Sequence, residues 1–170
     1  NENLTINLAP FSFFTVLSST WLVVSFSKEE KDKYKDTYQN ILREKEAVIN
    51  IGNIDTLDLI DKSSQPLNYN ESEVNLLKLN TNKSHKVRTP YLEEALVSFE
   101  VILEKTLDFN HLDSDDLENN VVFLRIQAVH IDKSIFNVYK KYIDFKKLNP
   151  VSRLSGANYG KCIKLDYTRI

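Results

Sequence analysis

The chain has 170 residues, enough for one domain that buries roughly 70% of the surface of its unfolded state. Its net charge of −2, from 22 basic and 24 acidic residues, argues against nucleic acid as a main partner, because a phosphate backbone is usually met by an excess of Lys and Arg. A single cysteine excludes an internal disulfide and makes the cytoplasm the default compartment. With three glycines, the sequence contains no Gly-rich phosphate loop.

The first apolar stretch, residues 6–27, has the length of a membrane span. It contains Pro10 and many hydroxyl residues, and no basic segment precedes it, so a membrane helix and a secretion signal are both disfavoured. Its β-branched and aromatic residues instead predict two strands, at 11–16 and 21–26. The hydroxyl cluster at residues 18–20 predicts the turn between them.

The middle of the chain alternates between helical and extended patterns. Tyr38, Ile41 and Leu42, with Lys45 after them, have the i, i+3, i+4, i+7 spacing of an amphipathic helix. Asp36 is the expected N-cap of this helix. The segments predicted next are a strand at 47–53, a short helix at 54–60, a loop at 62–72 and a brief helical or extended segment at 74–79.

Two long strands are predicted in the second half, at 95–109 and 120–132, joined by a solvated acidic hairpin loop at 111–120. A basic, loop-rich tail with one short helix follows at 139–162, and a last strand is expected at 161–167. This order predicts an α+β protein, mainly β, with an antiparallel sheet or small barrel. We expect a single domain over residues 1–170.

Segments far apart in the chain resemble one known family. The text "NLAPFSFFTVLSS", followed by "KDTYQNI", is similar to the flavin reductase-like, FMN-binding split-barrel proteins. Their usual pattern is N-x-A-P-F-S-x-F, a Ser-Ser turn and then K-D-T-x-x-N-I. Near the C-terminus, "NPVSRLSGANYG" is similar to their P-V-x-R-L-G-G-x-x-Y. The segments "AVHID" and "KSSQPLNYNESE" stand where such chains have similar sequences.

The sequence departs from the family pattern at three places. Trp21-Leu22 stand where Pro-Pro usually follows the Ser-Ser turn, and Ser155 replaces a usual glycine. The family normally has a strand and turn before N-x-A-P-F-S, whereas this sequence begins a few residues upstream of that motif. The resemblance therefore implies a split β-barrel with flanking short helices, in which the first strand is not accounted for.

The resemblance implies FMN as the cofactor, and two groups of residues are candidates for holding its phosphate. Lys35 and Thr37 lie at the start of the predicted helix, where free N–H groups favour an anion. A capped surface helix explains the same residues without a ligand. Ser18 and Ser19 offer hydroxyl and N–H groups for phosphate or ribityl oxygens, and an ordinary turn explains them equally well.

The edge of the flavin ring is expected along the N-x-A-P-F-S motif. Pro10 lacks an N–H group and interrupts a strand, so neighbouring backbone groups are free to bind the donors and acceptors of the pyrimidine edge. Ala9 is small enough for close approach of the ring, and Ser12 adds a hydroxyl. The alternative is that Pro10 only marks an edge strand or a bulge. The candidate ring-edge residues are Asn7, Leu8, Ala9, Pro10, Phe11 and Ser12.

Three further residues have structural as well as functional interpretations. The resemblance places Arg153 and Tyr159 near the flavin, in the same subunit or its partner. An ion pair for Arg153 and a core position for Tyr159 are the structural alternatives. His130 is expected to be a satisfied, half-buried histidine in a strand. The sequence indicates no metal site and no catalytic residue.

Taken as implied by the resemblance, the protein is a homodimer with FMN at the subunit interface. The leading hypothesis is a flavin reductase that passes hydride from NADH or NADPH to FMN, with the chemistry supplied by the cofactor. A second hypothesis is a non-catalytic FMN-binding or protein-interaction module, with docking surfaces at residues 28–35 and in the acidic hairpin. A third is a family member that has lost flavin. Neither nucleic acid nor membrane is expected as a partner.

Overall fold

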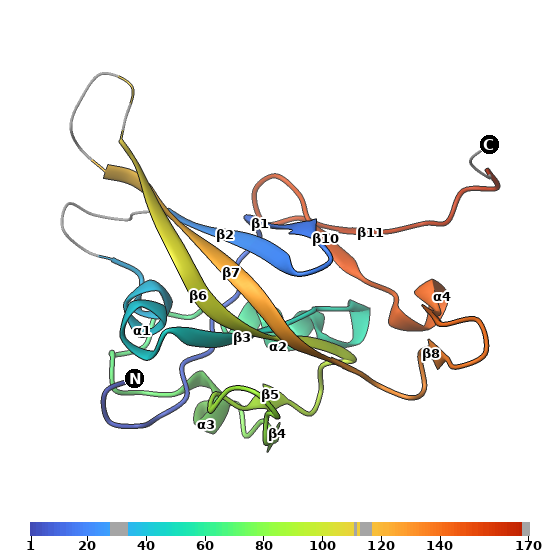
Figure 1. The fold of residues 1–170 in the computed structure, drawn as a ribbon, viewed down its shortest axis with the longest axis horizontal. Helices are drawn as coiled ribbons and strands as arrows, with labels where there is room; N and C mark the ends of the chain where they lie inside the picture. Colours follow the sequence, from blue (N-terminus) through green and yellow to red (C-terminus); the bar gives the residue numbers. More distant parts are fainter. Residues whose placement is uncertain (28–33, 111, 113–116, 168–170) are drawn as a thin grey trace.

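A five-stranded antiparallel sheet organises the computed structural model, which describes residues 1–27, 34–110, 112 and 117–167. Figure 1 shows its two longest strands as a twisted ribbon that crosses the molecule. The strand order is β1-β2-β7-β6-β3, and all neighbours are antiparallel. The strands are β1 (Phe14–Ser18), β2 (Trp21–Ser27), β3 (Glu46–Asn50), β6 (Val97–Asn110) and β7 (Leu117–Ile131).

Within the described residues, short helices and three two-stranded ribbons surround this sheet. The helices are α1 (Asp36–Glu44), the 3₁₀ turn η1 (Ile54–Thr56), α2 (Leu57–Lys62), α3 (Glu73–Leu76) and α4 (Phe145–Leu148). The ribbons pair β4 (Thr81–Asn82) with β5 (Tyr91–Leu92), β8 (Phe136–Asn137) with β9 (Tyr142–Ile143), and β10 (Val151–Arg153) with β11 (Tyr159–Lys161). None of the helices in the described part of the chain has the length and apolar character needed to cross a membrane.

The hydrophobic core lies between one face of the sheet and α1. On β2, Leu22, Val24 and Phe26 are buried and alternate with half-buried residues, as a strand with one covered face requires. Tyr38 and Ile41 of α1 pack against this face. Each large apolar side chain buried there contributes roughly 1.5–3 kcal/mol. The sheet and α1 therefore enclose the hydrophobic core of the molecule.

Most of the predicted elements are confirmed, in an α+β arrangement that is mainly β. The N-terminal apolar stretch forms a pair of strands, and the two long strands of the second half form one hairpin. Half of the acidic loop expected at 111–120 falls on residues outside the described part, and β7 already begins at Leu117. Residues 28–33 of the predicted charged docking segment also lie outside it.

Two local predictions are wrong. Lys35 is the N-cap of α1 and makes no side-chain capping bond, whereas Asp36 is already the first helical residue. Its carboxylate still lies in the first turn, where the helix dipole favours a negative charge. The last strand is Tyr159–Lys161, because it pairs with β10, and residues 162–167 form no strand.

A buried carboxylate of β6 holds the connection between β4 and β5. Glu100 is fully buried, and its oxygens accept hydrogen bonds from the backbone amides of residues 85–87 at 2.7, 2.5 and 3.1 Å. His130 contacts the same carboxylate through Nε2 and stacks on Tyr91, with ring centroids 4.0 Å apart. The expectation that His130 is satisfied and half-buried is confirmed.

Side chains of β3 hold the rest of this connection. Glu46 Oε1 accepts bonds from the amides of Arg88 (2.7 Å) and Thr89 (2.8 Å), and Asn50 Oδ1 accepts one from the amide of Leu92 (3.2 Å). Six backbone amides of residues 84–92 are thus bonded to side chains of the sheet. We call residues 84–92 the clamped segment.

Burial alone raises the pKa of Glu100, but hydrogen bonds from the amides of residues 85–87 and from His130 outweigh it and lower the pKa from 4.5 to about 2. A lowered pKa means that the ionised carboxylate stabilises the fold. This stabilisation is complete above the unfolded value of 4.5 and is lost as the pH falls through about 2.

We predict that Glu100→Gln lowers the free energy of unfolding by roughly 3 kcal/mol at neutral pH, because each unit of pKa shift corresponds to about 1.4 kcal/mol. The measurement is urea unfolding of both proteins as a function of pH. The difference should shrink as the solution is acidified below the unfolded pKa of glutamate. A difference that stays constant with pH would show that the charge of Glu100 is not what holds the clamped segment.

Candidate functional site

A cavity of about 1080 Å³ lies beside the core and is the candidate site. This volume is slightly above the range of roughly 300–1000 Å³ that is usual for small-molecule sites. Most of its wall comes from five parts of the chain: the N-terminal segment that leads to β1, helix α1, strand β3 with α2, the clamped segment, and the β10–β11 ribbon.

The amide side chain of Asn7 joins the N-terminal segment to α1. Its Oδ1 accepts a hydrogen bond from Thr37 Oγ1 at 2.8 Å and another from Asn40 Nδ2 at 3.3 Å. A carbonyl oxygen has two lone pairs, so both are used. The asparagine of "NLAPFS" is thereby bonded to the threonine and the asparagine of "KDTYQN", although thirty residues separate Asn7 from Thr37.

The residues on either side of Asn7 are held by α3. The amide of Leu8 donates to Glu73 Oε2 at 2.8 Å, and Ser72 Oγ donates to the carbonyl of Ile6 at 2.6 Å. Ser72 and Glu73 are both buried. The start of the segment is therefore fixed from two sides before it enters the cavity wall.

Beyond Leu8 the backbone has no such partners. Within the described residues, no hydrogen bond joins the backbone groups of Ala9, Phe11 or Ser12 to another part of the chain. Pro10 has no N–H group, and β1 begins only at Phe14, although a strand was expected from residue 11. Ala9–Ser12 line the cavity, so its wall carries unbonded amide and carbonyl groups.

Phe11 keeps this open stretch in place through its side chain. Its ring meets that of Phe26 edge to face, with centroids 4.7 Å apart, and it packs against the core. Such aromatic pairs contribute about 0.5–1.5 kcal/mol beyond the area they bury. The side chain of Phe11 is thus bound to the core while its backbone groups remain free.

The clamped segment forms the wall that contains Arg88, Thr89 and Pro90. The Arg88 guanidinium is largely exposed and is paired with Glu44, with Nη2 3.1 Å from Oε2. Among the described residues, Arg88 and Arg153 are the cationic side chains that line the cavity.

Arg153 and Tyr159 lie opposite each other in the β10–β11 ribbon, and both line the cavity. Arg153 Nη1 donates to the Tyr159 hydroxyl at 2.9 Å, and the guanidinium lies 4.9 Å from the centre of the tyrosine ring. Tyr159 is half-buried rather than a core residue, and Arg153 is paired with this neutral ring in place of the ion pair considered from sequence. Arg153 therefore presents a positive charge that Tyr159 does not neutralise.

The structure brings together nine of the twelve residues proposed from sequence. The nine that line the cavity are Asn7, Leu8, Ala9, Pro10, Phe11, Ser12, Thr37, Arg153 and Tyr159. Lys35 is not part of the lining, and neither are Ser18 and Ser19. Ser18 Oγ accepts a bond from the amide of Thr20 at 3.3 Å, which is the ordinary turn that the sequence also allowed.

Sequence reasoning missed several residues of the lining. Asn40 is the last residue of "KDTYQN", and Ser63 and Ser64 stand in "KSSQPLNYNESE", so both motifs contained an available signal. No local sequence signal pointed to Arg88 and Thr89, because their position depends on Glu46, more than forty residues earlier in the chain.

The sequence matches the family described as "Flavin reductase like domain" over residues 3–143. An uncharacterised protein of Bacillus subtilis, YwrF, is 31% identical over 157 residues, which cover 92% of this chain and 76% of that protein.

Two solved structures resemble the fold along almost its whole length. Component B of nitrilotriacetate monooxygenase from Bacillus cereus is 26% identical, with a TM-score of 0.91 over 99% of this chain and 82% of that one. The FMN-binding protein of Thermus thermophilus is 16% identical, with a TM-score of 0.70 over 98% and 84%. The fold is therefore the split barrel expected from the sequence, and the chain belongs to the flavin reductase-like family.

Proposed function

We propose that the cavity binds FMN and that the protein transfers hydride from NADH or NADPH to it. The observation that carries this proposal is the row of unbonded backbone groups over Ala9–Ser12 in the wall of a cavity large enough for a flavin. A flat ring with alternating donors and acceptors along one edge is the kind of ligand that such a row can bind. Membership of the family and the FMN-binding protein of the same fold support this choice of ligand.

In this proposal the chain's residues bind and orient. The backbone of Ala9–Ser12 holds the pyrimidine edge, and the small side chain of Ala9 allows the ring to approach closely. Arg153 supplies positive charge for the phosphate, since its guanidinium is paired with the neutral Tyr159 ring and can make charge-assisted bonds. Bound FMN supplies the hydride chemistry, so the protein's task is to leave one ring face open to a nicotinamide.

The structure leads us to revise part of the phosphate site that was proposed from the sequence. Thr37 lines the cavity, but its single hydroxyl proton is given to Asn7. We therefore assign Thr37 a positioning role: it holds Asn7, and Asn7 holds the segment that would meet the ring. Lys35, Ser18 and Ser19 remain candidates only for a part of the ligand that extends out of the cavity.

We also propose that the protein is a homodimer, joined through the sheet face opposite the core. Because alternate residues of a strand point to opposite faces, the buried positions of β2 put Trp21 and Val23 on that second face. Val23 pairs with Phe123, and Leu107 pairs with Val121, so apolar positions continue across β7 to β6. Four large apolar side chains have exposed fractions of 41–66%: Phe13, Leu17, Leu107 and Phe109. This area is of the kind that subunit contacts cover.

We predict that Asn7→Ala and Thr37→Val each weaken FMN binding by about tenfold, since each removes at least one hydrogen bond worth about 0.5–1.5 kcal/mol and loosens the ring-edge segment. Fluorescence titration of FMN measures the effect. Asn75→Ala is the matched control, an exposed asparagine outside the cavity. Equal affinity in all four proteins would reject the assigned role of Asn7.

Anaerobic mixing of the FMN-loaded protein with NADH or NADPH tests hydride transfer. We expect loss of the long-wavelength flavin absorbance at a rate typical of enzymes, about 1–1000 s⁻¹, with at least one of the two nucleotides. Free FMN with the same nucleotide, without protein, is the control. Bound flavin that neither nucleotide reduces would favour the non-catalytic FMN-binding module instead.

Sedimentation of the purified protein tests the dimer. We expect Leu107→Glu with Phe109→Glu to shift the wild-type dimer to a monomer, because a buried unpaired charge is costly. Leu76→Glu is the control, since Leu76 is 58% exposed on α3. A wild-type monomer at micromolar concentration, or a dimer that survives the double change, would contradict the assignment of this face.

A further inference from the structure

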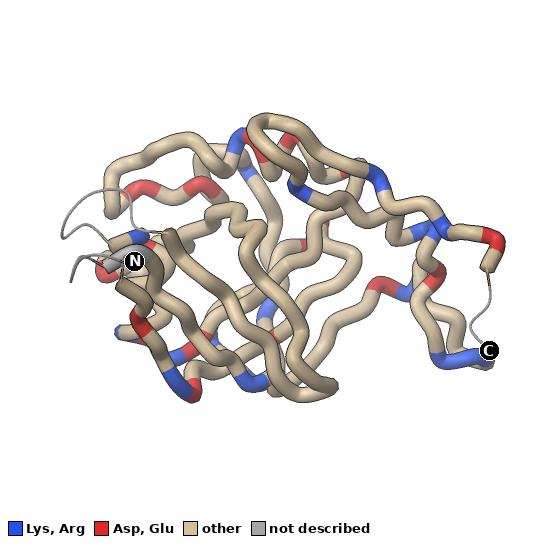
Figure 2. The backbone as a smooth tube through the Cα atoms, turned by 90° about the horizontal axis from the view of Figure 1, so that it is seen from above, with Lys and Arg blue, Asp and Glu red and all other residues tan. Residues whose placement is uncertain are grey.

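The C-terminal part of the chain has a charge opposite to that of the rest. Residues 133–164, which we call the basic lobe, contain seven Lys and one Arg against one Asp, a net charge of +7 in a chain of net charge −2. All eight basic side chains are exposed. Figure 2 shows basic positions gathered at the end of the molecule near the C-terminus. A surface of this kind attracts anions and steers their approach.

The single acidic residue of the lobe does not offset this charge at the surface. Asp144 caps α4, and its Oδ1 accepts bonds from the amides of Lys146 (3.0 Å) and Lys147 (3.4 Å). Lys147 in turn donates to the carbonyl of Ser134 at 3.0 Å, which joins α4 to the residues before β8. The lobe is thus internally bonded, and its lysine side chains are exposed.

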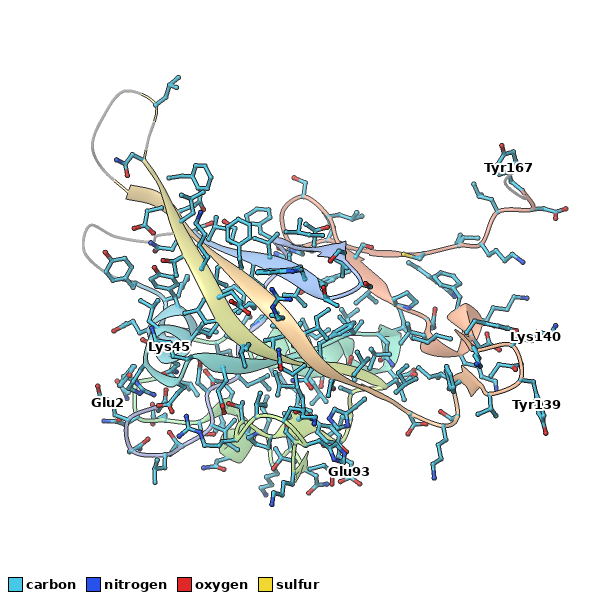
Figure 3. The ribbon with its side chains drawn as sticks, viewed as in Figure 1. Glu2, Lys45, Glu93, Tyr139, Lys140 and Tyr167 are labelled. Atoms are coloured by element: carbon cyan, nitrogen blue, oxygen red, sulfur yellow. The ribbon has the colours of Figure 1, made fainter. Side chains whose placement is uncertain are left out.

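Apolar side chains stand among these lysines. Tyr139 and Val138, at the tip of the β8–β9 hairpin, are 96% and 69% exposed, and Tyr142 is 47% exposed. Figure 3 shows Tyr139 and Lys140 pointing away from the body of the molecule. The turn is closed by a bond from the amide of Lys140 to Asn137 Oδ1 at 3.0 Å. A fixed turn that presents a tyrosine beside lysines is suited to contact with a partner, since aromatic residues are enriched at interfaces.

The lobe adjoins the candidate site. Its β10–β11 ribbon supplies Arg153 and Tyr159 to the cavity wall, and Val151, Ser152 and Ala157 line the cavity as well. A molecule seated on the β10–β11 side of the lobe would therefore lie next to the cavity.

We propose that the basic lobe docks the acidic face of a second protein, an electron carrier that exchanges electrons with the flavin. Lysines are strongly hydrated and are depleted from the centres of stable interfaces, so the association is of the transient, salt-sensitive kind found between redox proteins. The lobe consists of short hairpins and a four-residue helix, not the longer amphipathic helix that lies on a membrane surface. We therefore commit to a protein partner rather than to a lipid surface.

The exchange of electrons rests on the proposed function. The docking itself rests only on the exposed lysines and aromatic side chains of the basic lobe. Its test accordingly measures binding without turnover. The probe is the soluble haem domain of cytochrome b5, a small acidic electron carrier, titrated in its oxidised form against the purified protein at two salt concentrations. Failure of hydride transfer would leave this measurement unaffected, so the two proposals can fail separately.

We expect binding to weaken at least tenfold between about 10 mM and about 200 mM salt, which shortens the screening length from about 30 Å to under about 10 Å. Lys140→Glu with Lys141→Glu should weaken low-salt binding at least tenfold, and Tyr139→Ser by a smaller factor. The matched control is Lys83→Glu with Lys86→Glu, the same charge change at two exposed lysines outside the lobe, with binding expected within about twofold of wild type.

Three results would overturn the proposal: no binding at low salt, equal losses in the lobe and control variants, or tighter association with phosphatidylserine-containing vesicles than with the haem protein. The third would assign the lobe to a lipid surface. FMN affinity of each variant verifies that the fold is intact, because Tyr139, Lys140 and Lys141 do not line the cavity.

Discussion

One side-chain oxygen, Oδ1 of Asn7, connects the parts of the molecule from which the cavity is built. It receives the hydroxyl proton of Thr37 and an amide proton of Asn40, both from the same face of α1. Each bond is worth only about 0.5–1.5 kcal/mol, but together they fix the position of Asn7 against α1. The positions of Ala9 to Ser12, and hence the hydrogen-bonding groups of the cavity wall, follow from that point.

The molecule separates groups that hold the structure from groups that are left free. The clamped segment has its amides bonded to Glu46, Asn50 and Glu100, so that wall is fixed before any ligand arrives. The opposite stretch around Pro10 has an anchored side chain in Phe11 and an unbonded backbone. A site whose walls are fixed in advance loses less entropy on binding, which raises affinity without additional contacts. This arrangement is what the assignment of a flavin cavity depends on.

The elements with strong local patterns were predictable from sequence. β-branched and aromatic residues predicted the strands, the helical spacing of Tyr38 and Ile41 predicted α1, and the order of the motifs predicted the family and the split barrel. The predictions that failed depend on geometry that residue types do not encode. Asp36 was a reasonable cap by type, yet the backbone of Lys35 already takes the capping position. The sequence also did not reveal that the Thr37 hydroxyl donates to Asn7, because no local pattern connects two residues that are thirty positions apart.

A crystal structure of the protein grown with FMN would show where the flavin ring lies relative to Ala9–Ser12. We predict a flavin in the cavity, with its pyrimidine edge within hydrogen-bonding distance of backbone groups of Ala9 to Ser12, and with the Asn7–Thr37 bond retained. A flavin bound with that edge turned away from the segment, or an empty cavity at saturating FMN, would contradict it.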